Sequence, residues 1–245
     1  MEMMRKRWGR WLFAGLAAVA AACLVYAFYG PDRQAGYGMD AELQSRIARQ
    51  GLAPAGTYEL HRIFKASSYE VLDSQGNAVP LAQFTQNKYT LLTFFYESCS
   101  DAKGCPFAIT TLHALRGYLE KTPALASAVR FVNISFDPMR DTPVMMAGME
   151  KSMQQGKAKP ATEWRFLTTQ DVDHLMPIID GFGQNVEVVL DAETGEATMQ
   201  YQHVLKVFLI DREGYVREIY SALDLSPEVL LNDIYTLAMA DQTRH

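Results

Sequence analysis

Three short runs of almost uninterrupted apolar residues set the strongest limit on how this chain can fold. They are "KYTLLTFFY" at 88–96, "VRFVNISF" at 129–136 and "VLKVFLID" at 204–211. A strand that carries apolar side chains on both faces is buried on both faces, as in a sheet covered by helices. The segments between these runs show helical spacing of their apolar residues, so the sequence predicts an α/β sandwich.

The other predicted elements follow the same alternation of strands and helices. A turn at 212–214 joins the third run to an antiparallel partner, and a final amphipathic helix follows. This order predicts a mixed central sheet flanked by helices. We expect further strands at 57–64, 164–168 and 215–220, a hairpin turn at 73–77, and helices after Pro106, from Pro143 to about Gln155, over 171–180 and over 226–240.

The N-terminal segment has the pattern of a membrane anchor. Residues 11–30 carry no charge and approach the roughly 20 residues that a helix needs to cross the hydrocarbon core. The four basic residues that precede them are Arg5, Lys6, Arg7 and Arg10. This charge pattern predicts a cytoplasmic N-terminus and an exported body. A cleaved signal peptide and a lipid attached to Cys23 are the alternatives, but the run is longer than the roughly 7–15 apolar residues of a signal peptide.

These observations give a predicted organisation and location. We expect a cytoplasmic stub and transmembrane helix at 1–30, a linker at 31–56 with a short helix over Ala41–Arg49, and a folded domain at 57–245. The protein would then cross the bacterial inner membrane once and place its domain in the periplasm. The formal net charge is −5 and no basic stripe is present, so we expect no nucleic acid partner.

Cys99 and Cys105 lie where a predicted strand gives way to a predicted helix, in "FFYESCSDAKGCPFAIT" at 94–110. Pro106 suits the first turn of that helix, whose N-terminus favours the thiolate of Cys105. A disulfide across so short a loop would stabilise the fold only slightly. Exported thiols oxidise unless a metal or a reductant protects them, so a redox pair and a metal site both remain open.

Several longer motifs resemble, in order and spacing, the Sco/SenC family of membrane-anchored, thioredoxin-like copper proteins. They are "YEVLDSQGNAVPLAQFTQNKYTLLTFFYESC", "CPFAITTL", "ISFDPMRDTP" and "YQHVLKVFLIDREGYV". The resemblance implies a thioredoxin-like fold and one copper per chain, with Cys99, Cys105 and His203 as its ligands. Two thiolates select Cu(I) and an imidazole also accommodates Cu(II), although a Cys₂His set also suits zinc, usually with a fourth ligand.

The chain departs from the family pattern at two places. Five residues, "SDAKG", separate the cysteines, where the family usually has three. Gln202 precedes the histidine, where the family usually has an acidic residue that can orient the imidazole. Both thiols can still converge, because a longer loop closes at a small additional entropic cost.

The leading functional hypothesis is a metallochaperone that assists assembly of a copper site in a respiratory oxidase. The resemblance implies as partner a respiratory copper oxidase subunit or another copper protein, most simply the dinuclear copper site of cytochrome c oxidase. The alternative is a periplasmic thiol–disulfide oxidoreductase without metal, in which Cys99 attacks and Cys105 resolves. A docking protein that has lost the chemistry is a third class, disfavoured by the retained Cys, Cys and His.

Four methionines and two aspartates near these motifs admit functional and structural interpretations. Thioethers bind Cu(I), so a transfer track along 145–153 is conceivable. The four methionines are Met145, Met146, Met149 and Met153. Methionines at helical spacing more often fill the core of a protein. Asp137 and Asp141 are explained by a turn and by capping of the helix that begins at Pro143.

Overall fold

The computed structural model, which describes residues 39, 41–154 and 161–243, is organised by a six-stranded mixed sheet. The strand order is β1-β10-β9-β4-β5-β6. At its centre β4 (Tyr89–Phe95) pairs in parallel with β5 (Val129–Ser135) and antiparallel with β9 (Lys206–Ile210). Every residue of β4 and β5 is buried, which confirms that their apolar runs form strands covered on both faces.

The outer strands complete the sheet on either side. β6 (Glu163–Leu167) continues the parallel part, and β10 (Tyr215–Ser221) continues the antiparallel part. β1 (Phe64–Lys65) is only two residues long, whereas a strand was predicted over 57–64. The carbonyl of Leu60 accepts a hydrogen bond of 2.8 Å from Nε of the buried Arg217, so this residue is bonded to a side chain and not to a strand.

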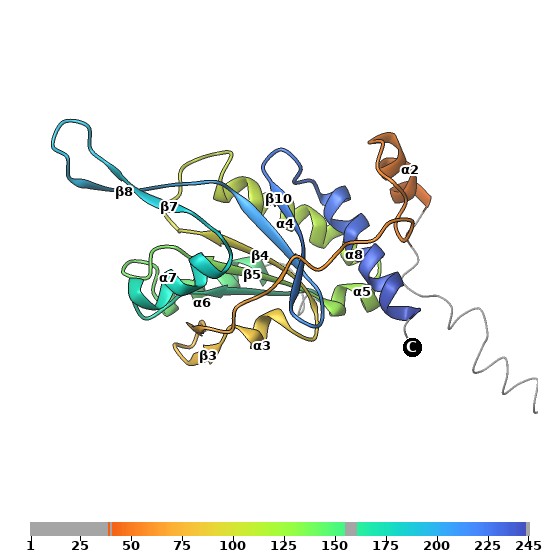
Figure 1. Cartoon of the computed structure of the whole chain (residues 1–245), viewed down its shortest axis with the longest axis horizontal. Helices are drawn as coiled ribbons and strands as arrows, with labels where there is room; N and C mark the ends of the chain where they lie inside the picture. The colour runs from red at the N-terminus through yellow and green to blue at the C-terminus, as the bar shows by residue number, and fades with distance from the viewer. Residues whose placement is uncertain (1–38, 40, 155–160, 244–245) are drawn as a thin grey trace, which may run out of the picture. The chain divides into compact units, whose positions relative to one another are not determined.

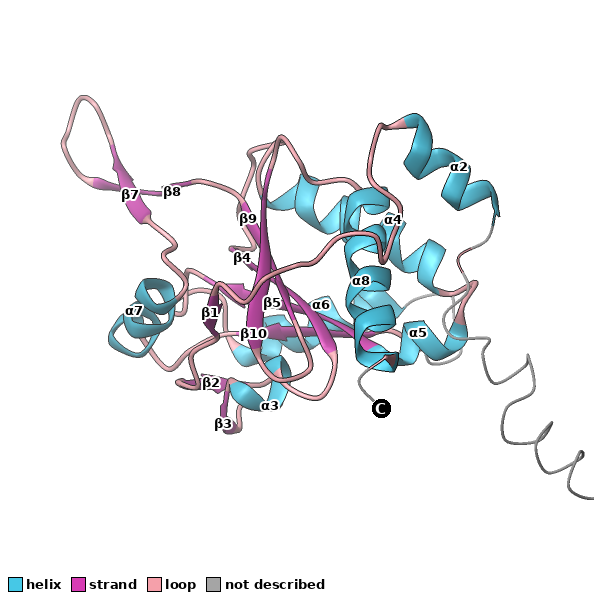
Figure 2. Ribbon diagram, turned by 45° about the vertical axis from the view of Figure 1, so that its right-hand side comes forward, coloured by secondary structure: helices cyan, strands magenta, loops and turns pink. Residues whose placement is uncertain are grey.

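Helices pack on this sheet in the arrangement of a thioredoxin-like fold, with α8 (Pro227–Gln242) running along α4 (Cys105–Leu119) (Figure 2). The predicted helices are confirmed: α6 spans Pro143–Gln154 and α7 spans Val172–Gly181. Two short helices were not predicted, and these are α3 (Ala82–Thr85) and α5 (Pro123–Ala128).

The predicted linker contributes a helix to the folded unit. α2 (Ala41–Arg49) has the predicted bounds, and it buries Leu43 and Ile47. Its Arg46 donates a hydrogen bond of 2.5 Å to Glu228 of α8. The compact unit therefore begins at Met39 and not near residue 57, because the apolar face of α2 is buried against it.

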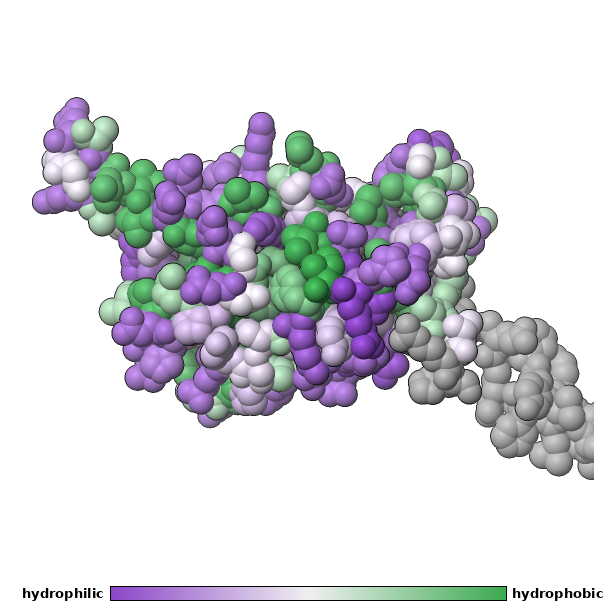
Figure 3. All heavy atoms as spheres, viewed as in Figure 1, coloured by the Kyte–Doolittle hydropathy of each residue, from purple (hydrophilic) through white to green (hydrophobic). Residues whose placement is uncertain are grey.

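Two hairpins lie outside the main sheet. β2 (Glu70–Leu72) and β3 (Ala78–Pro80) flank the predicted turn, in which the amide of Asp73 donates to the carbonyl of Asn77 at 3.0 Å. The second hairpin, β7 (Val186–Leu190) with β8 (Ala197–His203), was not predicted. It extends away from the sheet in Figure 1, and Figure 3 shows hydrophobic residues along it.

The transmembrane prediction falls on residues that the structure leaves undescribed. Across 39, 41–154 and 161–243, no helix combines the length and the apolar character that crossing a membrane requires. Residues 11–30, the predicted anchor, lie outside those ranges.

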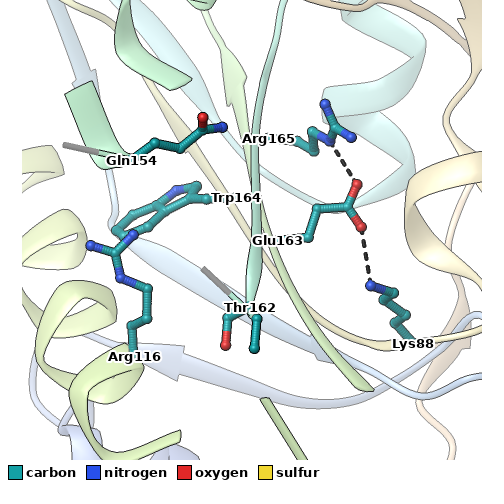
Figure 4. A pocket seen from close by; sticks show the side chains of 8 residues that line it. Lys88, Arg116, Gln154, Thr162, Glu163, Trp164 and Arg165 are labelled. Carbon is teal, nitrogen blue, oxygen red and sulfur yellow. Dashed lines mark hydrogen bonds and ion pairs between the residues drawn. The ribbon is translucent and has the colours of Figure 1, made fainter. Parts of the chain in front are cut away.

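A cluster of charges around Glu163 fixes the start of β6 beside β5. Figure 4 shows its carboxylate between Arg165 and Lys88, at 2.7 Å and 3.3 Å. Arg130 of β5 approaches the same carboxylate at 2.8 Å. Burial alone would raise the pKa of Glu163, but hydrogen bonds from Arg130 and Arg165 outweigh it and lower this pKa to about 2.

We predict that Glu163→Gln destabilises the fold in a pH-dependent way. The lowered pKa stabilises the fold fully above the unfolded value of 4.5, and this stabilisation is lost as the pH falls from there towards about 2. This pKa shift corresponds to a contribution of roughly 3 kcal/mol to the free energy of unfolding at pH 7. Urea unfolding of the parent and of Glu163→Gln between pH 7 and pH 2 measures this contribution.

The control is Glu42→Gln on the exposed side of α2, which should change the unfolding free energy by less than about 0.5 kcal/mol at any pH. If Glu163→Gln lowers the free energy of unfolding by the same amount at every pH from 7 to 2, the ionic role assigned to Glu163 is contradicted.

Candidate metal centre

The sheet topology brings distant parts of the sequence to one edge. Because β4 and β5 are parallel, their carboxyl ends meet at the same edge of the sheet. β9 runs antiparallel to β4, with Val207 opposite Thr93, so the beginning of β9 lies at that edge too. Cys99 follows β4 and His203 precedes β9, and the fold therefore places them near each other.

The loop between the cysteines is held by its own hydrogen bonds. The side chain of Asp101 accepts from the amide of Lys103 at 3.0 Å, and its carbonyl accepts from the amide of Gly104 at 2.9 Å. A Cβ on Gly104 would lie 3.2 Å from the Asp101 carboxylate, so glycine permits this tight return. Cys105 then begins α4, as predicted.

Both cysteines are free thiols, and they differ in exposure. Cys99 is half-buried and Cys105 is buried. The two interact, since Cys99 contributes to the pKa of Cys105 through a hydrogen bond and through its charge. The five-residue loop therefore brings the two thiols together.

His203 is the last residue of β8, and its ring faces the second cysteine. Its Nε2 lies 3.9 Å from Sγ of Cys105, and its Nδ1 lies 3.3 Å from the carbonyl oxygen of Tyr201. A carbonyl only accepts hydrogen bonds, so this contact requires the proton on Nδ1. In the neutral ring Nε2 then has its lone pair available, and metal-binding histidines are commonly held in this way.

Burial keeps both side chains of this pair neutral. It raises the pKa of the Cys105 thiol far above its ordinary range, and the neighbouring Cys99 raises it further. Backbone hydrogen bonds, one of them at the start of α4, lower this pKa, as expected of a helix N-terminus, but burial outweighs them. Burial also lowers the pKa of His203, against smaller opposing contributions from the Tyr201 carbonyl and Asp101.

Two aromatic side chains pack near the imidazole of His203. The ring of Phe136 lies 4.8 Å from that of His203, and the ring of Tyr96 lies 6.1 Å from it. Tyr201 and His203 share one face of β8, because side chains alternate along a strand. Gln202 points to the other face and is exposed. The hydrogen bond that orients the imidazole therefore comes here from the carbonyl of Tyr201 and not from the side chain at position 202.

Two acidic residues after β5 brace the surroundings of the site. The carboxylate of Asp141 accepts from the amide of Glu97 at 3.0 Å and from the hydroxyl of Ser135 at 2.5 Å. It therefore fixes the start of the cysteine loop. The sequence predicted only a turn or capping role for Asp141, so this role was missed. Asp137 pairs with Arg140, which also approaches the hydroxyl of Tyr201 at 3.4 Å.

A cavity of about 300 Å³ opens beside the cysteines. Its lining combines the end of β4, the start of α4 and one residue of α6. These residues are Phe95, Tyr96, Glu97, Cys99, Cys105, Pro106, Ile109, Thr110 and Met149. Met149 is therefore the one member of the predicted methionine series that the described lining includes.

The donor set fits a soft metal, although it is not closed around one. Two thiols with an imidazole are the ligands that copper in either oxidation state accepts. In the described ranges, no three side chains of the His, Cys, Asp and Glu types are gathered closely enough to hold a metal ion. The structure thus brings Cys105 and His203 together and sets Cys99 beside Cys105.

Comparison with known proteins gives one family and a consistent fold. A family model described as SCO1/SenC matches residues 60–239. No curated protein matches the chain. Bradyrhizobium japonicum ScoI, solved with copper bound, is 24% identical with a TM-score of 0.50, covering 74% of this chain and 98% of that one.

Two further solved structures have the same fold. A SCO1/SenC family lipoprotein from Bacillus anthracis is 20% identical with a TM-score of 0.56, covering 71% of this chain and 95% of that one. BsSco, described as a member of the Sco family of cytochrome c oxidase assembly proteins with a disulfide switch, is 17% identical with a TM-score of 0.52, covering 74% and 98%. At these identities the structures show the fold alone.

We predict that Tyr96→Phe loosens β8 in its separate hairpin while the six-stranded sheet stays intact. The hydroxyl of Tyr96 donates to Gln200 at 3.1 Å and accepts from the amide of Tyr201 at 3.4 Å. Losing both bonds should cost about 1 kcal/mol. Amide hydrogen exchange should become faster over 197–203 and stay unchanged in β4, whereas the exposed Tyr69→Phe should alter neither region. Unchanged exchange in β8 would contradict the bracing role of Tyr96.

Proposed function

The chain belongs to the SCO1/SenC family, and from that premise we propose that it is a membrane-anchored copper-binding protein. It receives one copper ion per chain as cargo and assists assembly of the copper site of a respiratory oxidase. The ligands are Cys99, Cys105 and His203. The solved relatives support this proposal, because one of them holds copper and another is assigned to cytochrome c oxidase assembly.

One observation carries the assignment of ligands. Nε2 of His203 faces Sγ of Cys105 at 3.9 Å, while Nδ1 is held by the Tyr201 carbonyl. A histidine packed only for structure has no need to present an unprotonated nitrogen to a buried thiol. This arrangement prepares an imidazole and a thiol to act on the same metal ion.

Binding then requires two changes within the site. The thiols lose their protons as they bind the metal, because thiolates are the ligand form. Cys99, which is half-buried, closes towards Cys105 and His203 to complete the set. The thiolates favour Cu(I) and the imidazole makes Cu(II) acceptable as well.

The proposed location follows from the N-terminal segment. An uncharged run at 11–30 behind four basic residues supports a single-pass anchor in the bacterial inner membrane, with the folded unit in the periplasm. Membrane attachment also agrees with the Bacillus anthracis relative, which is described as a lipoprotein. The partner is then a membrane-bound copper oxidase subunit or another copper protein on the same side.

A thiol–disulfide oxidoreductase is the second candidate, and the unequal exposure of the cysteines favours it. Cys99 is accessible and Cys105 is buried, which suits an attacking and a resolving thiol. The Cys99 thiolate would attack a partner disulfide, forming a mixed disulfide and releasing one partner thiolate. Cys105 would then attack the Cys99 sulfur, releasing the reduced partner and leaving a Cys99–Cys105 disulfide.

The test is copper titration of the reduced full-length protein in mild detergent, with metal analysis after desalting. We expect the parent to retain one copper per chain. Cys99→Ser and Cys105→Ser should abolish retention, because each removes a thiolate. His203→Ala should weaken binding while disulfide exchange largely survives, which separates the two candidate functions.

The matched control is His174→Ala, a histidine exposed at α7 and paired with Asp171 at 2.6 Å, which should leave copper retention unchanged. If His203→Ala binds copper as tightly as the parent, the ligand assignment is wrong. If the parent retains no copper and cycles a Cys99–Cys105 disulfide readily, the oxidoreductase function replaces the metallochaperone.

A further inference from the structure

The cavity beside the cysteines contains a sulfur atom that the family ligand set does not use. Met149 reaches it from α6, whereas both cysteines reach it from the end of β4 and the start of α4. Three sulfur-bearing side chains therefore line one cavity of about 300 Å³. The remaining lining is mostly apolar, with Phe95 and Ile109 among its members.

The structure separates the four methionines of α6 by their surroundings. Met146 is fully buried, which is the packing role expected of such residues. Met145 is 36% exposed and is not part of the described lining of the cavity. Met153 lies at the other end of α6, where its carbonyl accepts a hydrogen bond from Arg116. Met149 is half-buried, and it alone of this set is part of the described lining of the cavity that both cysteines share.

His203 and Met149 approach the cysteines differently. His203 contacts Cys105 together with the rings of Tyr96 and Phe136, and the described lining of the cavity does not include it. Met149 shares the cavity with both thiols. Copper bound to the thiols can thus take an imidazole from the β8 side or a thioether from the α6 side.

The two donors suit different oxidation states of copper. A thioether is a soft, uncharged donor and selects Cu(I), whereas an imidazole also accommodates Cu(II). A thioether needs no deprotonation, and the flexible methionine side chain can move to a metal without a change of backbone. Sulfur ligation from the cavity side therefore adds affinity for Cu(I) and almost none for Cu(II).

We propose that Met149 is a ligand specific for Cu(I), which binds through its Sδ atom the metal held by Cys99 and Cys105. This inference rests on the proposed copper-binding function. It assigns the cavity as the side on which the reduced metal is held, and it makes residue 149 a determinant of the preference between Cu(I) and Cu(II).

The first test compares affinities for the two ions in reduced full-length protein, using competition with a chromophoric Cu(I) chelator and a separate Cu(II) titration. We expect Met149→Leu to weaken Cu(I) binding by roughly 10- to 100-fold, the range found when a group supporting a metal site is removed. Binding of Cu(II) should stay within about twofold of the parent, because Cys99, Cys105 and His203 remain.

Met145→Leu is the matched control, since it makes the same substitution on the same helix outside the described lining of the cavity. It should leave both affinities unchanged. The metal-free parent and both variants should have the same unfolding temperature and the same reduction potential of the Cys99–Cys105 pair. A difference in either value would indicate a general structural effect of the substitution.

A second measurement needs no substitution and tests the bond directly. In selenomethionine-labelled protein loaded with Cu(I), the extended X-ray absorption fine structure at the copper edge should show one selenium atom in the first coordination shell. Its absence overturns the inference even if copper is retained, and so does a Met149→Leu variant with the Cu(I) affinity of the parent. Failure of the parent to retain any copper instead overturns the proposed function.

Discussion

The burial of β4 on both faces is the constraint on which the rest of the structure depends. Its seven residues are all buried, so its position and register are set by contacts on every side. β5 and β9 pair with it in opposite directions, and their directions decide which loops meet at its carboxyl end. The candidate metal centre is assembled from the segments that meet there, which explains how Cys105 and His203, about a hundred positions apart, share one small site.

Much of this arrangement could be predicted from the sequence, because buried strands and amphipathic helices leave clear patterns. The helix beginning at Pro143 starts where predicted, the helix predicted over 226–240 spans Pro227–Gln242, and α2 has the predicted bounds. The site itself was identified differently. The spacing of Cys99 and Cys105 left both a redox pair and a metal site open, and only the family resemblance added His203.

The β7–β8 hairpin escaped prediction for a physical reason. Most of β7 is exposed, and the described residues of β8 are exposed or at most half-buried, so neither strand carries the apolar run that marks a buried strand. Tyr201 was missed with it, although its separation of two residues from His203 would have placed both on one face of a recognised strand. The carbonyl that fixes the His203 ring could not be found from residue identity at all, because any residue supplies a carbonyl.

The same hairpin has a consequence for how copies of this protein behave together in solution. Its two strands pair with each other and with no further strand of the described residues, and Val188, Val189 and Leu190 are exposed in succession. Exposed strand edges of this kind favour self-association. The hairpin also carries four acidic side chains, which make copies repel one another: Glu187, Asp191, Glu193 and Glu196. Because salt screens this repulsion, the colloidal stability of the protein falls as ionic strength rises.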